Sequence, residues 1–437
     1  MTSNETIRLS NQTARRRVAT RVIAGAENMV KSPVLFACFA ALIVLETLLF
    51  VFREAIVIAT VPTILVAMMV DFATVLAPIY MIGILVGYLM IIGTPWNARG
   101  ISDNLHRAGV FNKIEEAPIL MHKYQDENNP RITILDFKST GISRTTWEDL
   151  QAEIESALNC YVVKIQEGKH QNRMLLHIVA SSDKLPEKIL WTEDHMVDDD
   201  CTLVLGQTVA GTDVTADLSR MPHILIGGAT GSGKTVLLKH LLWQCISKGA
   251  EVYIADFKGG VDFGCFWEKH ATLILDEQTL LTQLADIVHQ LEERKQLFRN
   301  ANVANIAEYN QKTGANLKRI IFACDEIAEL LDKTGASKEQ KAVIDQITSY
   351  LSTISRQARA FGGSFLAGTQ RPSADVLVGQ IKNNFSLRAC GVADQVLSNI
   401  VLDRPDAADL IPKDSHKFLM DDGTVFQPYY FEEPDRL

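Results

Sequence analysis

The chain has 437 residues, of which 47% are apolar, and a formal net charge of −9. That length allows two or three domains, and the apolar content together with a mean hydropathy of +0.07 is high for a wholly soluble protein. The acidic balance excludes a surface that is basic throughout, although it is compatible with a local basic channel. Seven scattered cysteines without a CxxC pair indicate reduced thiols in a cytoplasmic setting, and argue against a disulfide framework or a zinc site.

Residues 1–33 are polar and basic, with Arg15, Arg16, Arg17 and Arg21 ahead of the first apolar run. Positive charge of this kind keeps a segment on the cytoplasmic side of a membrane. The stretch is too long for a usual signal peptide and shows no small-residue cleavage site. We therefore expect a basic cytoplasmic tail.

Residues 34–97 form the predicted membrane region. A first apolar run covers 34–52 and a second lies within 72–93, and each is long enough to cross a bilayer. Basic residues precede the first run and reappear at Arg99, which favours an even number of crossings with both ends inside. We expect two transmembrane helices in the cell membrane, a cytoplasmic motor domain, and an apolar segment 55–70 that forms an outer hairpin or lies in the interface. The alternative is a buried helical hairpin of a soluble protein.

Residues 98–200 are predicted to form a small membrane-proximal α/β domain. A juxtamembrane linker near 98–125 leads into a β-α-β-β pattern, in which the helix opens with a threonine and an acidic first turn. Nothing in this segment indicates a catalytic site. The expected elements are strands at 131–137, 161–166 and 173–179 and a helix at 145–158.

Residues 201–437 alternate between apolar strands and helices, which is the pattern of a parallel sheet with crossover helices. The predicted fold class is therefore α/β, with a sheet-and-helix motor domain behind the small domain and the membrane hairpin. Strands are expected at 223–226, 252–255, 319–324, 364–368 and 387–392, and helices at 236–242, 280–298 and 340–360.

The segment 228–235 fits the pattern G-x-x-x-x-G-K-S/T at every fixed position, between an expected strand and an expected helix. In that context the glycines let successive backbone N–H groups point at one anion, and the helix N-terminus adds partial positive charge. Lys234 is placed to reach the β- and γ-phosphates of ATP, and the Thr235 hydroxyl to ligate Mg²⁺. The predicted nucleotide-binding residues of this loop are Gly228, Ala229, Thr230, Gly231, Ser232, Gly233, Lys234 and Thr235.

Polar residues follow three further strands, at the edge of the sheet where ligands bind in open α/β folds. Asp325 is placed to hold Mg²⁺, and Glu326 to polarise the attacking water as general base. Gln370, after the next strand, is placed to sense the γ-phosphate or to orient that water. Asp256 and Lys258 follow the third strand, where a structural turn explains them nearly as well.

Phosphoryl transfer also gains speed from an arginine that neutralises charge in the transition state, often one from a neighbouring subunit. Arg356 and Arg359, on the expected helix before the Gln370 strand, are candidates for that catalytic role. An ordinary exposed helix surface explains both arginines equally well.

Several further segments accompany these motifs in order along the chain. They are 205–218 (LGQTVAGTDVTADL), 221–223 (MPH), 227–235 (GGATGSGKT), 256–259 (DFKG), 291–294 (LEER), 305–310 (NIAEYN), 324–329 (CDEIAE), 357–360 (QARA), 369–376 (TQRPSADV) and 381–384 (IKNN). Together they resemble the motor domain of the FtsK/SpoIIIE family of DNA translocases, over about residues 200–431.

The resemblance implies a RecA-like P-loop fold and a homo-hexameric ring that threads double-stranded DNA at the expense of ATP. It matches Arg359 to the trans-acting arginine of the family, in preference to Arg356. It also matches Arg371 and Lys382 to positions that face the DNA pore, where cations suit contact with backbone phosphates.

Two features depart from the larger members of that family. The chain ends soon after the motor, where the family has a winged-helix domain, and it lacks the four spans and long linker of the cell-division members. In this it resembles the short coupling proteins of conjugative elements. We expect a membrane-anchored ATPase that delivers DNA to a conjugative channel, with channel proteins or a relaxase as partners. The alternatives are a chromosome-partitioning pump of the FtsK/SpoIIIE type, a related ATPase for protein export, and a non-enzymatic membrane scaffold.

Overall fold

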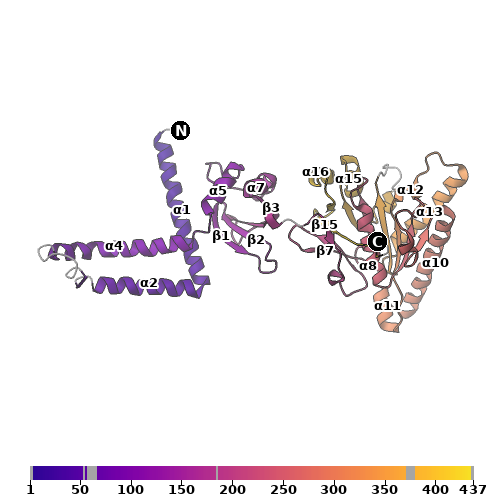
Figure 1. The fold of residues 1–437 in the computed structure, drawn as a ribbon, viewed down its shortest axis with the longest axis horizontal. Helices are drawn as coiled ribbons and strands as arrows, with labels where there is room; N and C mark the ends of the chain where they lie inside the picture. The colour runs from indigo at the N-terminus through magenta and orange to yellow at the C-terminus, as the bar shows by residue number, and fades with distance from the viewer. Residues whose placement is uncertain (1–2, 53–54, 57–65, 184–185, 371–378, 435–437) are drawn as a thin grey trace. The chain divides into compact units, whose positions relative to one another are not determined.

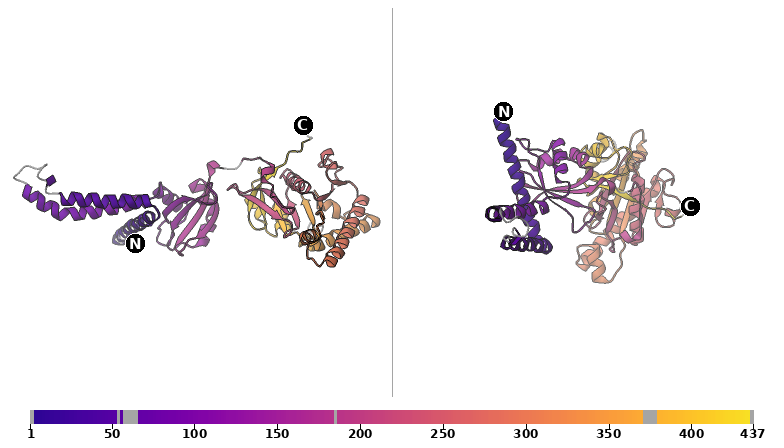
Figure 2. Two further views of the ribbon diagram at one scale, coloured as in Figure 1. Left: turned by 90° about the horizontal axis from the view of Figure 1, so that it is seen from below. Right: turned by 60° about the vertical axis from the view of Figure 1, so that its left-hand side comes forward.

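The computed structural model describes residues 3–52, 55–56, 66–183, 186–370 and 379–434, and of these it describes 3–16, 66–73 and 379–380 by backbone alone. The chain folds into two units, residues 1–184 and residues 185–437. Figures 1 and 2 show long helices and a small sheet in the first unit, and a larger sheet flanked by helices in the second.

The first unit begins with three long helices, α1 (Ser3–Lys31), α2 (Pro33–Val51) and α4 (Val66–Ile92). The Ser32 hydroxyl caps α2 by accepting the Leu35 N–H, and proline at the first helical position suits that start. All of α2, and the part of α4 from Thr74 to Ile92, are long and apolar enough to cross a membrane. The two apolar helices expected from the sequence are therefore present. Most of the predicted segment between them lies outside the described residues.

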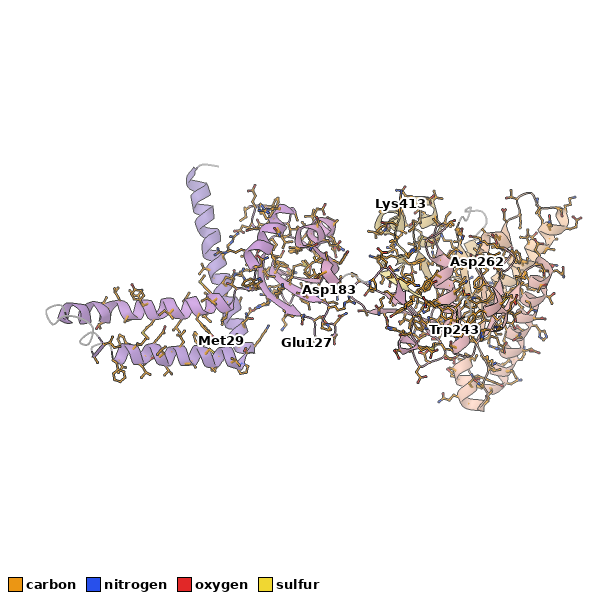
Figure 3. All side chains as sticks on the ribbon, viewed as in Figure 1. Met29, Glu127, Asp183, Trp243, Asp262 and Lys413 are labelled. Carbon is orange, nitrogen blue, oxygen red and sulfur yellow. The ribbon has the colours of Figure 1, made fainter. Side chains whose placement is uncertain are left out.

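Helix α1 occupies most of the region that we expected to be a polar tail, so this segment is helical; its cytoplasmic location stays a prediction. Where α1 meets the end of α4, the two backbones touch at glycines. A Cβ on Gly25 would lie 1.9 Å from a carbonyl oxygen of α4, and a Cβ on Gly93 would lie 2.0 Å from one of α1. The Asn28 side chain donates to an α4 carbonyl at 2.8 Å. Figure 1 shows α1 running past the end of α4 to the start of α2, and Met29 in Figure 3 marks the end of α1 that leads into α2.

The rest of the first unit is a four-stranded antiparallel sheet in the order β1-β2-β4-β3, with helices packed on one face. The predicted linker is wrong, because it contains α5 and β1. The expected helix at 145–158 is two helices, since the backbone at Leu150 (φ −102°, ψ 20°) leaves the α-helical conformation. The elements are α5 (Ala98–Arg107), β1 (Ile119–Gln125), β2 (Thr133–Lys138), α6 (Arg144–Asp149), α7 (Gln151–Leu158), β3 (Cys160–Glu167) and β4 (Arg173–Ala180).

The two faces of strand β2 contact different parts of this unit, the hydrophobic core on one side and helix α1 on the other. Phe137 points into the core under the short helices, where its ring packs on Trp147 with centroids 5.3 Å apart. Lys138, one residue on, points to the other face and donates to the Thr20 hydroxyl of α1 at 3.3 Å. Helix α1 therefore approaches the sheet from the face opposite its hydrophobic core.

The second unit is built on one mixed sheet with the strand order β10-β9-β11-β12-β8-β13-β14-β15-β6-β7. Neighbours from β10 to β13 are parallel, and those from β13 to β7 are antiparallel. The strands are β5 (Ile189–Leu190), which pairs with β15, and β6 (Thr202–Gln207), β7 (Asp213–Asp217), β8 (His223–Gly227), β9 (Glu251–Ala255), β10 (Thr272–Ile274), β11 (Ile320–Cys324), β12 (Gly363–Thr369), β13 (Leu387–Cys390), β14 (Phe418–Met420) and β15 (Val425–Tyr430). The helices are α8 (Lys234–Ser247), α9 (Cys265–Glu268), α10 (Glu277–Ala301), α11 (Ile306–Thr313), α12 (Ile327–Leu331), α13 (Lys338–Gln357), α14 (Gly379–Lys382), α15 (Gln395–Leu402) and α16 (Asp406–Leu410).

Helices cover both faces of this sheet, so that a core lies on each side. Phe365 and Ala367 of β12 belong to the core under α10 and α13, whereas Leu366 belongs to the core under α8. The five strands predicted for this part correspond to β8, β9, β11, β12 and β13, and the three predicted helices to α8, α10 and α13. The predicted α/β fold is confirmed, with a sheet that is parallel from β10 to β13 and antiparallel beyond β13.

The register of the central strands decides which residues meet. In the parallel pair β11–β12, Cys324 lies opposite Ala367, and in the pair β12–β8, Thr369 lies opposite Gly227. The carboxyl ends of β8, β11 and β12 are thus level with one another. The residues that follow these three strands therefore lie close together at one edge of the sheet.

Candidate functional site

The phosphate loop, residues 228–233, connects β8 to α8. Gly231 and Gly233 have φ angles of 82° and 93°, a conformation that costs any residue with a side chain. Gly228 has no room for a side chain either, because a Cβ there would lie 2.3 Å from the Ser232 Oγ. The bend in this loop therefore requires glycine at 231 and 233, and the close approach of Ser232 favours glycine at 228.

The loop has the properties of an anion site. Ser232 is 2% exposed, and its Oγ has no hydrogen-bond partner among the described residues. A cavity of about 520 Å³ opens beside the loop and is lined in part by Gly231, Gly233, Lys234 and Thr235. That volume lies in the range of about 300–1,000 Å³ that small-molecule sites usually have. The loop N–H groups, the start of α8 and the lysine are the donors that a triphosphate needs, so these residues fit ATP.

Lys234 and Asp325 form a buried ion pair in the crevice between loop and sheet. The Lys234 Nζ lies 2.6 Å from Asp325 Oδ1 and also donates to the Asp325 carbonyl oxygen. The Thr235 Oγ1 donates to the same Oδ1 at 2.8 Å. The two charged side chains are 3% and 2% exposed, so bulk water does not solvate them. Three residues predicted for one site from two distant motifs thus lie in direct contact.

Asp325 lies between two lysines. The Lys258 Nζ is 3.2 Å from Asp325 Oδ2 and 3.7 Å from Asp262, which Figure 3 labels. Burial by itself would raise the pKa of Asp325, but the two lysines and the Thr235 hydroxyl outweigh burial and hold that pKa below its usual value. Burial likewise lowers the pKa of Lys258, and the carboxylates around it outweigh burial and raise that pKa overall. Both groups are charged at neutral pH.

The donor set at this point also suits a magnesium ion. Mg²⁺ prefers oxygen ligands and is usually held by one or two protein groups together with substrate phosphates. Thr235 Oγ1 and Asp325 Oδ1 are two such oxygens, 2.8 Å apart beside the phosphate loop. Within the described ranges no group of three or more His, Cys, Asp or Glu side chains is arranged to hold a metal. The residues present therefore fit Mg²⁺ bound together with a nucleotide.

Glu326 is fixed in position by the end of strand β12. Its Oε2 accepts the Gln370 N–H at 2.7 Å, and its Oε1 accepts the Thr369 hydroxyl at 3.1 Å. The Gln370 side chain in turn accepts a hydrogen bond from the Thr230 hydroxyl of the phosphate loop at 3.1 Å. The acid, the glutamine and the loop are therefore joined by one series of hydrogen bonds.

The sequence left open whether Asp256 and Lys258 belong to the site or form a structural turn, and the structure gives a different answer for each residue. The Asp256 carboxylate accepts the Lys258 N–H at 3.0 Å, which is the bond of a tight turn. Asp256 is 2% exposed, and its Oδ2 has no partner among the residues that the structure describes. The Lys258 side chain reaches the site through Asp325. Asp256 shapes the turn, whereas Lys258 contributes charge to the crevice.

The two candidate arginines lie elsewhere. Arg359 is exposed, and its Nε donates to the Ser219 carbonyl at 3.0 Å. Arg356 is exposed as well, and its Nε donates to the Ser352 carbonyl of its own helix at 3.0 Å. In the described part of this chain, neither arginine contacts the phosphate loop.

Of the two residues predicted to contact DNA, the structure describes Lys382, whereas Arg371 lies outside the described residues. The Lys382 Nζ lies 2.5 Å from the Asp403 carboxylate, and its side chain is 18% exposed. Arg388 binds the same carboxylate. Lys382 is thus a largely covered cation that shares one acid with an arginine.

Three residues of this site were missed in the sequence. A Cβ on Gly368 would lie 2.2 Å from the Asp325 carbonyl oxygen and 2.9 Å from the Lys234 Nζ, so glycine lets the buried pair approach β12. His416 and Tyr430 line the cavity beside the loop. The one signal for Gly368 in the sequence was its place just before the polar end of a strand. No local motif marked His416 or Tyr430.

Comparison with known proteins shows what this chain resembles. A model of the FtsK/SpoIIIE family matches residues 188–374. The chain is 28% identical over 300 residues to the DNA translocase FtsK of Campylobacter jejuni, and 32% identical over 230 residues to the DNA translocase SftA of Bacillus subtilis. These alignments cover 64% and 50% of this chain, but 30% and 23% of the relatives. The chain thus spans less than a third of the length of either protein.

Among solved structures, the chain is similar to the conjugation coupling protein TcpA of pCW3, solved as a monomer with ATPγS. The two are 34% identical and superpose with a TM-score of 0.58. The superposition covers 77% of this chain and 96% of that one.

Proposed function

The chain belongs to the FtsK/SpoIIIE family, and from this membership we propose that it is an ATP-driven DNA translocase. The observation that carries the proposal is the crevice at the carboxyl ends of β8, β11 and β12, where the phosphate loop meets Asp325 and Glu326. Phosphoryl transfer needs a cradle for phosphates, oxygen ligands for a metal and a group that orients water. All three are supplied here by residues in mutual contact.

In this proposal Lys234 and the loop N–H groups bind the phosphates of ATP. Thr235 and Asp325 would hold Mg²⁺, which supplies positive charge to the phosphate oxygens. The ion pair with Asp325 keeps the Lys234 ammonium inside the crevice. The lysine is therefore already held beside the cavity that it lines, and little side-chain freedom is lost when a nucleotide binds.

Glu326 acts as the general base in this proposal. Its carboxylate accepts two hydrogen bonds from the end of β12, which fix its orientation. Water attacks the γ-phosphorus, its proton passes to Glu326, and the bond to the ADP oxygen breaks. Gln370, bonded to Thr230, connects the base to the loop that holds the phosphates.

Arg359 is proposed to act on the ATP of a neighbouring subunit in a homo-hexamer. Its position supports this role, because it is exposed, lies away from the crevice of its own chain and is oriented by the Ser219 carbonyl. An arginine delivered from a neighbour couples hydrolysis to the arrangement of the ring. For DNA contact we propose Arg371 and Lys382, of which Lys382 would exchange Asp403 for a backbone phosphate.

We further propose that α2 and α4 both cross the cell membrane and that the motor works in the cytoplasm. The length and apolar character of the two helices support this topology. The similarity to TcpA over 77% of this chain supports a role as a coupling protein that delivers DNA to a conjugative channel, with channel proteins or a relaxase as partners.

The test is ATP turnover by the purified full chain, with and without duplex DNA. We expect DNA to stimulate hydrolysis by the wild type, and Lys234→Ala to abolish turnover in both conditions. Lys341→Ala, which removes an exposed lysine of α13, is the matched control and should behave as the wild type. Full DNA-stimulated turnover by Lys234→Ala would contradict the assignment of this site.

A further inference from the structure

A second cavity lies in the first unit, where α4 ends. Its volume is about 680 Å³, within the range that is usual for small-molecule sites. Met90 and Thr94, at the end of the apolar helix, form one wall, and Val18 of α1 and Ile119 of β1 contribute further apolar surface. The cavity thus adjoins the point at which the second apolar segment, Thr74–Ile92, is complete.

Three arginines line this cavity. Arg17 and Arg21 are four residues apart on α1, so that they lie on one face of that helix, and Arg99 comes from the first turn of α5. The Arg21 Nη1 donates to the Gly93 carbonyl at 3.3 Å and to the Leu120 carbonyl. These two bonds hold the guanidinium between α4 and the sheet, with its other nitrogens free of hydrogen bonds to any described residue.

Among the described residues, little negative charge faces these arginines. Glu27, the acid nearest on α1, pairs with His122 and approaches Arg173 instead. Among the described residues no carboxylate forms an ion pair with Arg21 or Arg99. Burial lowers the pKa of Arg21, and the like charges of its two neighbouring arginines lower it further. Asp103 also lines the cavity, which leaves three cations against one acid.

We propose that this cavity binds the phosphate of an anionic phospholipid headgroup. A guanidinium donates two parallel hydrogen bonds to phosphate oxygens, and basic pockets at the cytoplasmic ends of membrane helices suit such headgroups. The apolar wall beside the arginines fits an amphipathic ligand better than free phosphate, because it offers a surface to the start of the acyl chains. The proposal rests on membrane insertion of α2 and α4. A bound lipid would fix α1 and α5 to the membrane surface.

The test is native mass spectrometry of the full chain in detergent, titrated with phosphatidylglycerol. Phosphatidylcholine and inorganic phosphate serve as comparison ligands. The variant Arg17→Gln/Arg99→Gln removes two exposed cations and leaves Arg21 with its backbone bonds. The matched control is Lys164→Gln/Lys169→Gln, which removes two exposed charges from β3 and the loop after it.

We expect the wild type to bind phosphatidylglycerol in preference to phosphatidylcholine. The arginine variant should bind it about 30-fold more weakly, which corresponds to about 1 kcal/mol for each arginine lost, and the lysine variant should match the wild type. Equal affinity in the arginine variant and the wild type would overturn the proposal. Equally tight binding of inorganic phosphate would overturn the lipid assignment.

Three further measurements test the guanidinium contact and separate this proposal from those it rests on. Arg21→Lys keeps the charge but loses the paired donors, so it should bind phosphatidylglycerol more weakly than the wild type; unchanged binding would count against a guanidinium–phosphate contact. Extraction of membranes with alkaline carbonate reports insertion of the two helices, and DNA-stimulated ATP turnover reports the motor. The arginine variant should match the wild type in both assays, so that loss of lipid binding is assigned to the cavity.

Discussion

The buried pair of Lys234 and Asp325 makes the most direct prediction about the physical basis of the site. Removing one partner of a buried pair leaves the other charge uncompensated, at a cost of about 3–5 kcal/mol. Asp325→Ala leaves Lys234 unpaired and also takes the Lys258 Nζ away from its partner at 3.2 Å. Lys234→Ala leaves Asp325 with Lys258 and the Thr235 hydroxyl, so it should cost less. At about 2–4 °C per kcal/mol for a unit of this size, we expect Asp325→Ala to lower the melting temperature by about 6–20 °C.

The assay is a double-mutant cycle in the full chain without nucleotide. Stability of the second unit is read from the urea dependence of amide hydrogen exchange in β11 and β12. We expect a coupling free energy of about 2 kcal/mol between Lys234 and Asp325. The control pair is Lys333–Asp345, whose charged atoms are also 2.6 Å apart but whose side chains are 46% and 63% exposed. Its coupling should be below about 1 kcal/mol. Additivity within about 0.5 kcal/mol at Lys234 and Asp325 would refute this reasoning.

The stability that Asp325 contributes should depend on pH, and the sign of this dependence follows from its pKa. Asp325 has a lower pKa in the folded protein than its unfolded value of about 3.9. Its contribution to stability is therefore fully present above that value and is lost as the pH falls through the folded pKa. The wild type should lose stability more steeply than Asp325→Asn below about pH 4. Parallel loss in the two proteins would mean that Asp325 is not held as a charged partner.

Three other predictions concern the crevice and the neighbouring subunit. Gly368→Ala should destabilise the second unit by about 1–3 kcal/mol and reduce ATP turnover, because its Cβ would meet the buried pair. Gly264→Ala, with no atom within 4 Å of the added carbon, is the control, and equal stability of the two variants by hydrogen exchange would contradict the predicted overlap. Glu326→Gln should bind a fluorescent ATP analogue as the wild type does but turn over ATP about 10²–10⁴-fold more slowly; a smaller loss would argue against a general base at this position. Mixing Arg359→Ala with Lys234→Ala chains should restore part of the turnover that each lacks alone, because some interfaces then combine an intact arginine with an intact lysine. No recovery in a mixed assembly would argue against a trans-acting arginine.

The contact among Lys234, Thr235 and Asp325 was largely predictable, because the sequence signals for it are local; their role in nucleotide binding stays a prediction. The glycine motif predicts the bend of the loop. Each polar pair follows a short apolar run, which predicts a buried strand. Parallel strands bring their carboxyl ends to one edge, so the contact between Thr235 and Asp325 at 2.8 Å follows from topology. The role of Lys258 was left open for the opposite reason. Its backbone N–H bonds to Asp256 in a turn, while its side chain reaches Asp325. The sequence pattern predicts the turn, but the contact with Asp325 depends on tertiary packing.

The elements that were missed depend on partners far away in the sequence. Helix α1 is polar and has no apolar stripe of its own, and it is held by backbone contact at Gly25 and Gly93, which no periodicity reveals. Strands β14 and β15 depend on pairing with strands far away in the sequence, because they connect β13 to β6 within the sheet. His416 and Tyr430 lie before β14 and at the end of β15, and they reach the cavity beside the phosphate loop with these strands. Side chains recruited in this way carry no motif.

The central claim is that hydrolysis in this crevice drives movement along DNA. The most direct measurement is displacement of a third strand, hybridised as a triplex on linear duplex DNA, by the purified full chain. We predict displacement that requires ATP and is absent in Lys234→Ala. Displacement at the same rate without ATP, or no displacement at saturating ATP while hydrolysis proceeds, would contradict the account.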